Sequence, residues 1–147
     1  MGIEAGLVTY LNARAGLMAI VGTRIYPQLV PQAAQGSDNY PAVTYQVIDE
    51  PNEHYLGGVS QLAHPRVQIT AWARTFLAAL SIRDALVDAL DGFAGTMGTF
   101  SVSPCLKIDE GDMPEDSDAS PGLQTARVWG RRIDFEIWFN EPVPSYA

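Results

Sequence analysis

The sequence predicts an α+β fold, in which an antiparallel β-sheet carries two main helices on one of its faces. Two segments place apolar residues at helical spacing, and three show the two-residue alternation of strands that have one apolar face. The order along the chain is helix, strands, helix, strands, without the β-α-β alternation that builds parallel sheets. A length of 147 residues suits one domain with its own core, so we expect a single domain over residues 1–147.

The first helix is expected over residues 3–20. Gly16 lowers helix stability and is the position at which this segment would divide into a helix and one further turn. Gly22 predicts the end of the helix, because glycine readily takes the left-handed conformation found there. The apolar residues recur near one face, at Ile3, Leu7, Leu11 and Met18.

A short extended piece at residues 24–27 leads into a polar loop at residues 31–39. Pro41 opens the next strand, where a proline leaves the hydrogen-bonding ladder intact. The connection that follows, residues 51–65, contains Gly57-Gly58, a good turn signal. We expect a β-hairpin or a long loop there, between antiparallel neighbours.

Residues 66–74 alternate between apolar and polar side chains and are predicted to be a strand that runs directly into the second helix. That helix is expected to end at Asp91-Gly92. Its core face is wide and predicts that the helix lies across the sheet. The face consists of Ala79, Ile82, Leu86, Ala89 or Leu90, and Phe93.

The last third of the chain is expected to form two strands separated by a loop. Residues 99–108 are predicted to be a strand, although Pro104 disfavours it. Six acids, two prolines and two glycines favour a loop over residues 109–122. Residues 127–139 show the strongest strand pattern, and residues 140–147 are expected to be a C-terminal tail that is flexible unless a partner binds it.

Composition limits the classes of function. The net charge is −8 with a single lysine, so the surface repels a phosphate backbone and a stable nucleic-acid complex is disfavoured. The negative charge remains compatible with DNA that passes an acidic wall without binding to it. Cys105 is the only cysteine, which excludes an internal disulfide. No apolar run is long enough to span a membrane, and the N-terminus does not resemble a signal peptide, so we expect the protein to act in the cytoplasm in which it is made.

The sequence offers no convincing catalytic, metal or cofactor site. The acids of residues 109–118 lack the order of a calcium loop and favour a solvated segment. His54 and His64 stand without metal-ligand spacing, Ser60 lacks the second glycine of a nucleophile elbow, and Cys105 has no activating partner. We therefore expect a protein that is not an enzyme and that binds no cofactor.

Interaction surfaces are the better candidates. Trp72 and Trp138 fall on the polar faces of their strands, and aromatic residues at such places are typical of protein interfaces. With Trp129 and Tyr45 they could instead form a stacking platform for single-stranded nucleic acid, which would need a basic groove. The predicted interface residues are Trp72, Trp138, Asp109, Glu110, Asp112, Glu115, Asp116, Asp118 and, in the tail, Tyr146.

An ordered series of segments carries a resemblance to a known family. The segments are Val21-Gly-Thr-Arg-Ile-Tyr-Pro27, Tyr40-Pro-Ala-Val-Thr-Tyr-Gln-Val-Ile48, Arg66-Val-Gln-Ile-Thr-Ala-Trp-Ala-Arg74 and Arg131-Arg-Ile-Asp-Phe-Glu-Ile-Trp-Phe139. In this order and spacing, residues 5–140 resemble the tail-completion, or tail-terminator, proteins of long-tailed bacteriophages and phage-derived gene transfer particles.

This resemblance implies an α+β subunit that assembles as a ring, commonly six-fold, at the head-proximal end of the tail tube. The ring would end tube polymerisation and join the tail to the head connector or stopper, with DNA passing through as cargo. Its partners would be copies of itself, the tube protein and the connector, with no membrane. It would lie in the virion after assembly in the host bacterial cytoplasm.

Other readings of the sequence stay open. Within the viral class, the chain could be a head-completion, connector or minor tail protein. From another class, it could be a small-molecule or peptide-binding domain built on the same sheet. A hydrolase with unrecognised catalytic groups is the third alternative. Concentration-dependent ring assembly would separate the tail-terminator reading from the last two.

Overall fold

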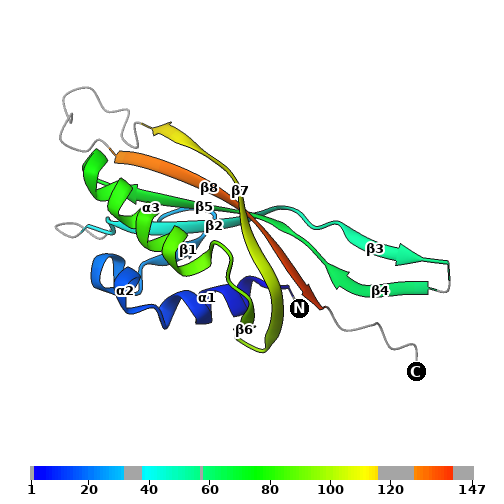
Figure 1. Ribbon diagram of the computed structural model, residues 1–147. Coiled ribbons are helices and arrows are strands. Elements are labelled where there is room, and N and C mark those ends of the chain that lie inside the picture. The colour runs from blue at the N-terminus through cyan, green and yellow to red at the C-terminus, as the bar shows by residue number, and fades with distance from the viewer. Residues whose placement is uncertain (1, 32–37, 57, 116–127, 141–147) are drawn as a thin grey trace.

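The α+β prediction is confirmed by a computed structural model, in which all strands join one curled sheet (Figure 1). It describes residues 2–31, 38–56, 58–115 and 128–140, without the side chains of 52–55, 58–61 and 114–115. The helices are α1 (Glu4–Asn12), α2 (Ala15–Val21) and α3 (Phe76–Leu90). In the described part of the chain, none is long and apolar enough to cross a membrane.

The strands form a mostly antiparallel sheet in the order β1-β2-β5-β8-β4-β3, with β7 along the other side of β8 and β6 along β7. Only β1 and β2 run parallel to each other among the described pairs, which is a departure from the expected antiparallel sheet. Their bounds are β1 (Ile25–Pro27), β2 (Ala42–Asp49), β3 (Asn52–Tyr55), β4 (Gly58–Ala63), β5 (Arg66–Ala73), β6 (Gly95–Met97), β7 (Phe100–Glu115) and β8 (Val128–Asn140).

The N-terminal helical segment divides earlier than predicted. The break falls at Ala13, which keeps a helical backbone, and at Arg14, whose backbone is extended; Gly16 lies inside α2. Because the break restarts the helical spacing, Leu17 is buried in α2 while Met18 is only half-buried. Gly22 ends α2 with a φ of 59°, so the predicted helix end is confirmed.

Helix α3 and the sheet enclose the core. The Thr75 side chain caps the helix by accepting a hydrogen bond of 3.2 Å from the Ala78 N–H, which satisfies one of the free donors of the first turn. All three helices lie on one face of the sheet, here called the covered face (Figure 1). The predicted stripe of α3 is buried there against β5 and β8, through Ala79, Ile82, Leu86 and Leu90.

The prediction of a loop over residues 109–122 is wrong for residues 109–115. They continue β7, which runs from Phe100 to Glu115 and pairs with β8 as far as Glu115 and Val128. Register shifts beside Pro104 and at Ile108 absorb the irregular composition. Local composition favoured a loop, but hydrogen bonding to β8 along most of its length decides the structure. Residues 116–122 lie outside the described residues.

The predicted hairpin over residues 51–65 is confirmed as strands β3 and β4. Only Leu62 and Ala63 of β4 pair with β8, so most of the hairpin extends beyond the sheet. Figure 1 shows this arm at one end of the molecule, with α2 and the start of α3 towards the other end.

Candidate interaction surfaces

The face of the sheet opposite the helices, here called the open face, is paved by two large side chains that lie over glycines. Trp72 of β5 donates its indole N–H to the Thr44 hydroxyl at 2.9 Å. A Cβ at Gly130 of β8 would come within 2.6 Å of the Trp72 ring, so the indole lies directly over this glycine. Trp72 is therefore half-buried within its own chain, and its predicted interface role stays a prediction.

Arg132 repeats this arrangement one row along the sheet. A Cβ at Gly111 of β7 would meet the Arg132 guanidinium at 2.9 Å. Such side chains bury polar residues on a face that carries no helix: Thr44, Thr70 and Asp134 are 5%, 4% and 2% exposed. Large flat side chains over small ones thus replace a second layer of secondary structure here.

Asp134 is the centre of an ion-pair group on the open face, the Asp134 cluster, with Arg66, Asp109 and Arg132. Arg66 donates to one Asp134 oxygen from both Nε, at 3.1 Å, and Nη2. Arg132 lies 3.5 Å from the same oxygen and 3.2 Å from Asp109. The other oxygen of Asp134, Oδ1, is buried with no hydrogen-bond partner in the described residues.

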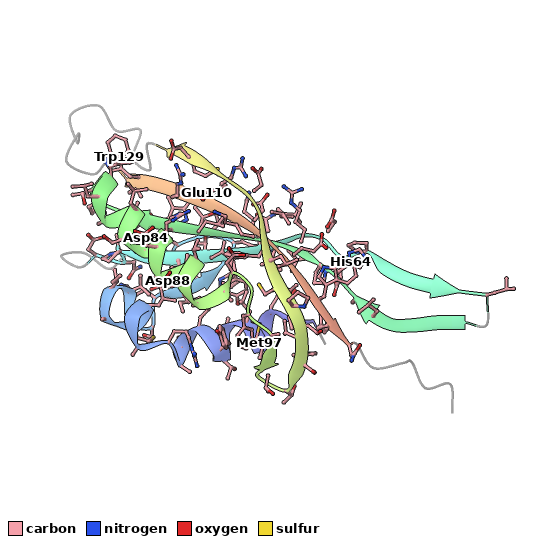
Figure 2. The ribbon with its side chains drawn as sticks, viewed as in Figure 1. His64, Asp84, Asp88, Met97, Glu110 and Trp129 are labelled. Atoms are coloured by element: carbon pink, nitrogen blue, oxygen red, sulfur yellow. The ribbon has the colours of Figure 1, made fainter. Side chains whose placement is uncertain are left out.

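Trp138 lies where the open face meets the arm. Its indole stacks on the His64 ring, with centroids 4.2 Å apart and an interplanar angle of 15°. His64 follows β4 directly, and its place at the base of the arm is visible in Figure 2. The stack occupies one face of each ring, so Trp138 supports the base of the arm, and its role as an interface residue is untested.

A second ion-pair group, the Glu110 cluster, lies on the covered face beside α3. The Glu110 carboxylate accepts hydrogen bonds from Arg83 at 2.7 and 2.9 Å, from Lys107 at 3.1 Å and from Arg131 at 2.8 Å. Hydrogen bonds from Arg83, then from Arg131 and Lys107, outweigh partial burial and hold the pKa of Glu110 well below its usual range. Arg131 also pairs with Asp112, and Arg83 with Asp84.

The irregularity at Ile108 makes the Glu110 cluster possible. In a regular strand, residues three apart point to opposite faces, so Lys107 and Glu110 could not meet. The extra residue between the pairs Lys107–Phe135 and Asp109–Asp134 brings Glu110 back to the face of Lys107. The same shift directs Asp109 to the open face. The bulge therefore decides which acids of this run reach each face, and so which cluster each one joins.

Both clusters are neutral. The Glu110 cluster holds three acidic and three basic residues, and the Asp134 cluster holds two of each. The 17 acidic and 9 basic residues of the chain give a net charge of −8. Because five of each lie in these clusters, the rest of the chain carries the whole net charge.

The structure therefore separates the acids that the sequence placed in one loop. Asp109 lies on the open face, whereas Glu110 and Asp112 lie on the covered face. Glu115 ends β7, and its side chain is outside the described part, as are Asp116, Asp118 and Tyr146. Among the predicted interface residues whose side chains are described, Trp72, Trp138 and Asp109 therefore lie on the open face, whereas Glu110 and Asp112 lie on the covered face.

One apolar surface was missed from the sequence. Phe76 and Leu77 in the first turn of α3, and Trp129 at the start of β8, are exposed by 44%, 74% and 41%. Phe76 and Trp129 meet edge-on with ring centroids 5.8 Å apart, and Figure 2 shows Trp129 near the start of α3. The sequence did contain a signal for this surface: Phe76 and Leu77 are large apolar residues that precede the buried stripe of α3 and lie outside it.

The remaining chemical candidates gain no support. Cys105 is fully buried and desolvation raises the pKa of its thiol to about 12, so it is a core residue with little thiolate at neutral pH. The side chains of His54 and Ser60 lie outside the described part. Within the described residues, no group of three His, Cys, Asp or Glu side chains could hold a metal ion.

Comparison with known proteins gives matches of two kinds. A family model described as "Tail completion protein gp17" matches residues 5–139. A chain of the solved structure titled "Virion of native gene transfer agent (GTA) particle" has the same fold, with a TM-score of 0.71 over 94% of each chain and 18% sequence identity. No curated protein matches the chain.

Proposed function

Since the chain belongs to the tail completion protein gp17 family, we propose that it forms a ring at the head-proximal end of a phage-type tail tube. The ring ends polymerisation of the tube and joins the tail to the head connector, and DNA passes through its centre. Family membership carries this proposal, because the matched residues 5–139 include nearly all of the described helices and of the sheet.

The family makes this a structural tail-completion protein, and its membership suggests a role in assembly rather than catalysis. The fold supports the assignment, because the chain shares it with a protein of a gene transfer agent virion. From that similarity we propose that this chain, too, is located in a virion or transfer particle, assembled in the bacterial cytoplasm.

A ring of identical copies needs two different complementary patches on each subunit. The surfaces of this chain fit that requirement, since they differ in kind and position. The open face carries Trp72, Arg132 and the Asp134 cluster, and the arm projects from the sheet. The Phe76–Leu77–Trp129 surface lies at the N-terminal end of α3. We propose that the open face and the arm contribute to subunit contacts, and that the C-terminal tail, including Tyr146, contributes to end-face contacts.

DNA is proposed as passing cargo rather than a bound partner. Non-specific DNA binding depends on Lys and Arg displacing counterions, and five of the nine basic residues are already paired in the two neutral clusters. The residues outside those clusters carry the whole net charge of −8, and their acids are the proposed lining of the channel. Asp109, Glu110 and Asp112 are not included, because they are paired with basic residues.

The test is assembly. Light scattering over a wide range of protein concentration, with negative-stain images of the same samples, should give closed rings with a central hole, six-fold if the resemblance holds in full. The protein should also bind one end of purified tail tubes and stop their growth. Monomers that leave tube ends free would contradict the proposal. Binding to head-side connectors without tubes would instead favour a head-completion protein.

A further inference from the structure

The arm formed by β3 and β4 ends in an apolar side chain, Leu56, that the described residues leave fully exposed. Leu56 at the turn has a relative exposure of 109%, the largest among the exposed large hydrophobic residues described. Water around an apolar side chain at a projecting tip is unfavourable, and burial by a partner would remove that cost. The His64–Trp138 stack braces the base of the arm, so the position of the tip is partly fixed before any contact forms.

A groove lies towards the other end of the molecule, between the α1–α2 junction and α3. Its volume is about 550 Å³, within the roughly 300–1,000 Å³ of binding pockets in proteins. Small and apolar residues line most of the groove, together with Tyr10 and Ser81, and Arg14, Asp84 and Asp88 add charged groups. The small and apolar residues are Ala13, Ala15, Gly16, Leu17, Ala85 and Ala89. Figure 2 shows Asp84 and Asp88 on α3, away from the arm.

We propose that the Leu56 tip of one copy docks in the α2–α3 groove of the next copy in the ring. This proposal rests on the proposed function, because it specifies the contact that closes the ring. The arm extends away from the groove of its own chain, so the two can meet only between copies (Figure 1). Every copy carries both, which gives the head-to-tail contact that a ring requires.

The groove is a better docking site for a hairpin tip than the surface formed by Phe76, Leu77 and Trp129. The alanine, glycine and leucine residues that line the groove leave room for a leucine side chain. Arg14, Asp84 and Asp88 offer charged groups of both signs, which can pair with backbone N–H and C=O groups that a turn leaves without partners. Phe76 and Trp129, in contrast, already pack on each other.

Disulfide trapping tests the contact directly. A chain carrying Leu56→Cys and Ala85→Cys should, on mild oxidation of assembled protein, give a ladder of cross-linked oligomers up to the full ring. The native Cys105 does not interfere, because it is fully buried. Two chains that each carry one of the two substitutions, beside the native Cys105, should cross-link to each other after mixing. The control Leu56→Cys with Leu77→Cys should give no ladder, since Leu77 is exposed but lies outside the groove.

A second pair of variants measures the energy of the contact. Leu56→Asp should raise the protein concentration needed for half-assembly about tenfold or more, since it removes burial of a leucine side chain. Its melting temperature should not change, because Leu56 is exposed. Leu77→Asp, the matched control, should assemble as the wild type does.

The two levels of the proposal fail differently. Rings or capped tubes that form without the 56–85 cross-link, or equally well with Leu56→Asp, would overturn the arm-and-groove contact and leave the ring intact. No rings and no capped tubes from the wild-type protein would overturn the proposed function, and the contact with it.

Discussion

The two faces of the sheet bury their residues by different means. On the covered face, apolar side chains such as Phe135 and Ile137 pack against helices and are fully buried. On the open face, Thr44, Thr70 and Asp134 are almost as buried, although the helices all lie on the other side. Trp72 and Arg132 cover that face by lying over Gly130 and Gly111. Burial therefore does not require a second layer of secondary structure, but it then depends on a few individual side chains.

The largest effect is expected from a cavity on the covered face. Phe135→Ala should lower the free energy of unfolding by about 3–5 kcal/mol, because the lost side chain leaves a space that the close-packed core fills poorly. Urea denaturation followed by circular dichroism would measure this. If Phe135→Ala lowered the free energy of unfolding no more than Gly130→Ala does, the conclusion that the two faces bury their residues by different means would be contradicted.

An added methyl group should be costly at Gly130. Gly130→Ala places a Cβ 2.6 Å from the Trp72 ring and 3.0 Å from the Met113 Cβ, so overpacking should cost about 1–3 kcal/mol. In a Trp72→Leu background the same change should cost much less, which a double-mutant cycle by urea denaturation would measure. Equal costs in both backgrounds would mean that Trp72 does not pave the open face.

The Glu110 cluster should show a pH-dependent contribution. Glu110→Gln leaves Arg83 and Arg131 without their shared carboxylate and should cost about 1–2 kcal/mol at pH 7. The folded-state pKa of Glu110 is depressed below its ordinary 4.5. Its contribution is therefore full above about pH 4.5 and is lost as the pH falls towards the folded-state pKa.

Unfolding of the wild type and Glu110→Gln between pH 7 and pH 3 would measure that contribution. The two stability curves should converge only below about pH 4.5. A constant difference down to pH 3 would indicate that the loss comes from packing rather than from the ionised carboxylate.

The smallest effect is expected at the exposed edge of the same cluster. The Asp112 side chain is 61% exposed and pairs with Arg131, so Asp112→Asn should cost no more than about 0.5 kcal/mol. Added salt should reduce even this difference in thermal unfolding. A cost equal to that of Glu110→Gln would show that the cluster acts as one unit.

Periodicity predicted the covered face well because its signal is local. The stripe of α3 and the alternation of β5 are visible in consecutive residues and were confirmed down to Ala79 and Val67. The course of residues 109–115 could not be predicted in this way. Their stability as a strand depends on β8 and on Arg83 and Arg131, which are distant in sequence.

The candidate surfaces show the same limit. The alternation of apolar and polar residues in β5 correctly predicted that Trp72 lies on the open face. It could not predict that Trp72 lies over Gly130, because that depends on the register between β5 and β8. The groove between α2 and α3 combines residues about 70 positions apart, so no local pattern reveals it. Alanine and arginine both favour helices, so composition could not locate the break at Ala13 and Arg14.

The placement of the arm and the groove at opposite ends of the subunit has a genetic consequence. A copy damaged in the arm alone keeps its groove, so it still accepts a neighbour and then ends the chain of subunits. Such an allele, co-expressed with the wild type, would be dominant negative. A few defective copies would be enough to prevent many rings from closing. Damage to both ends would make the allele recessive, because the copy could no longer join any ring.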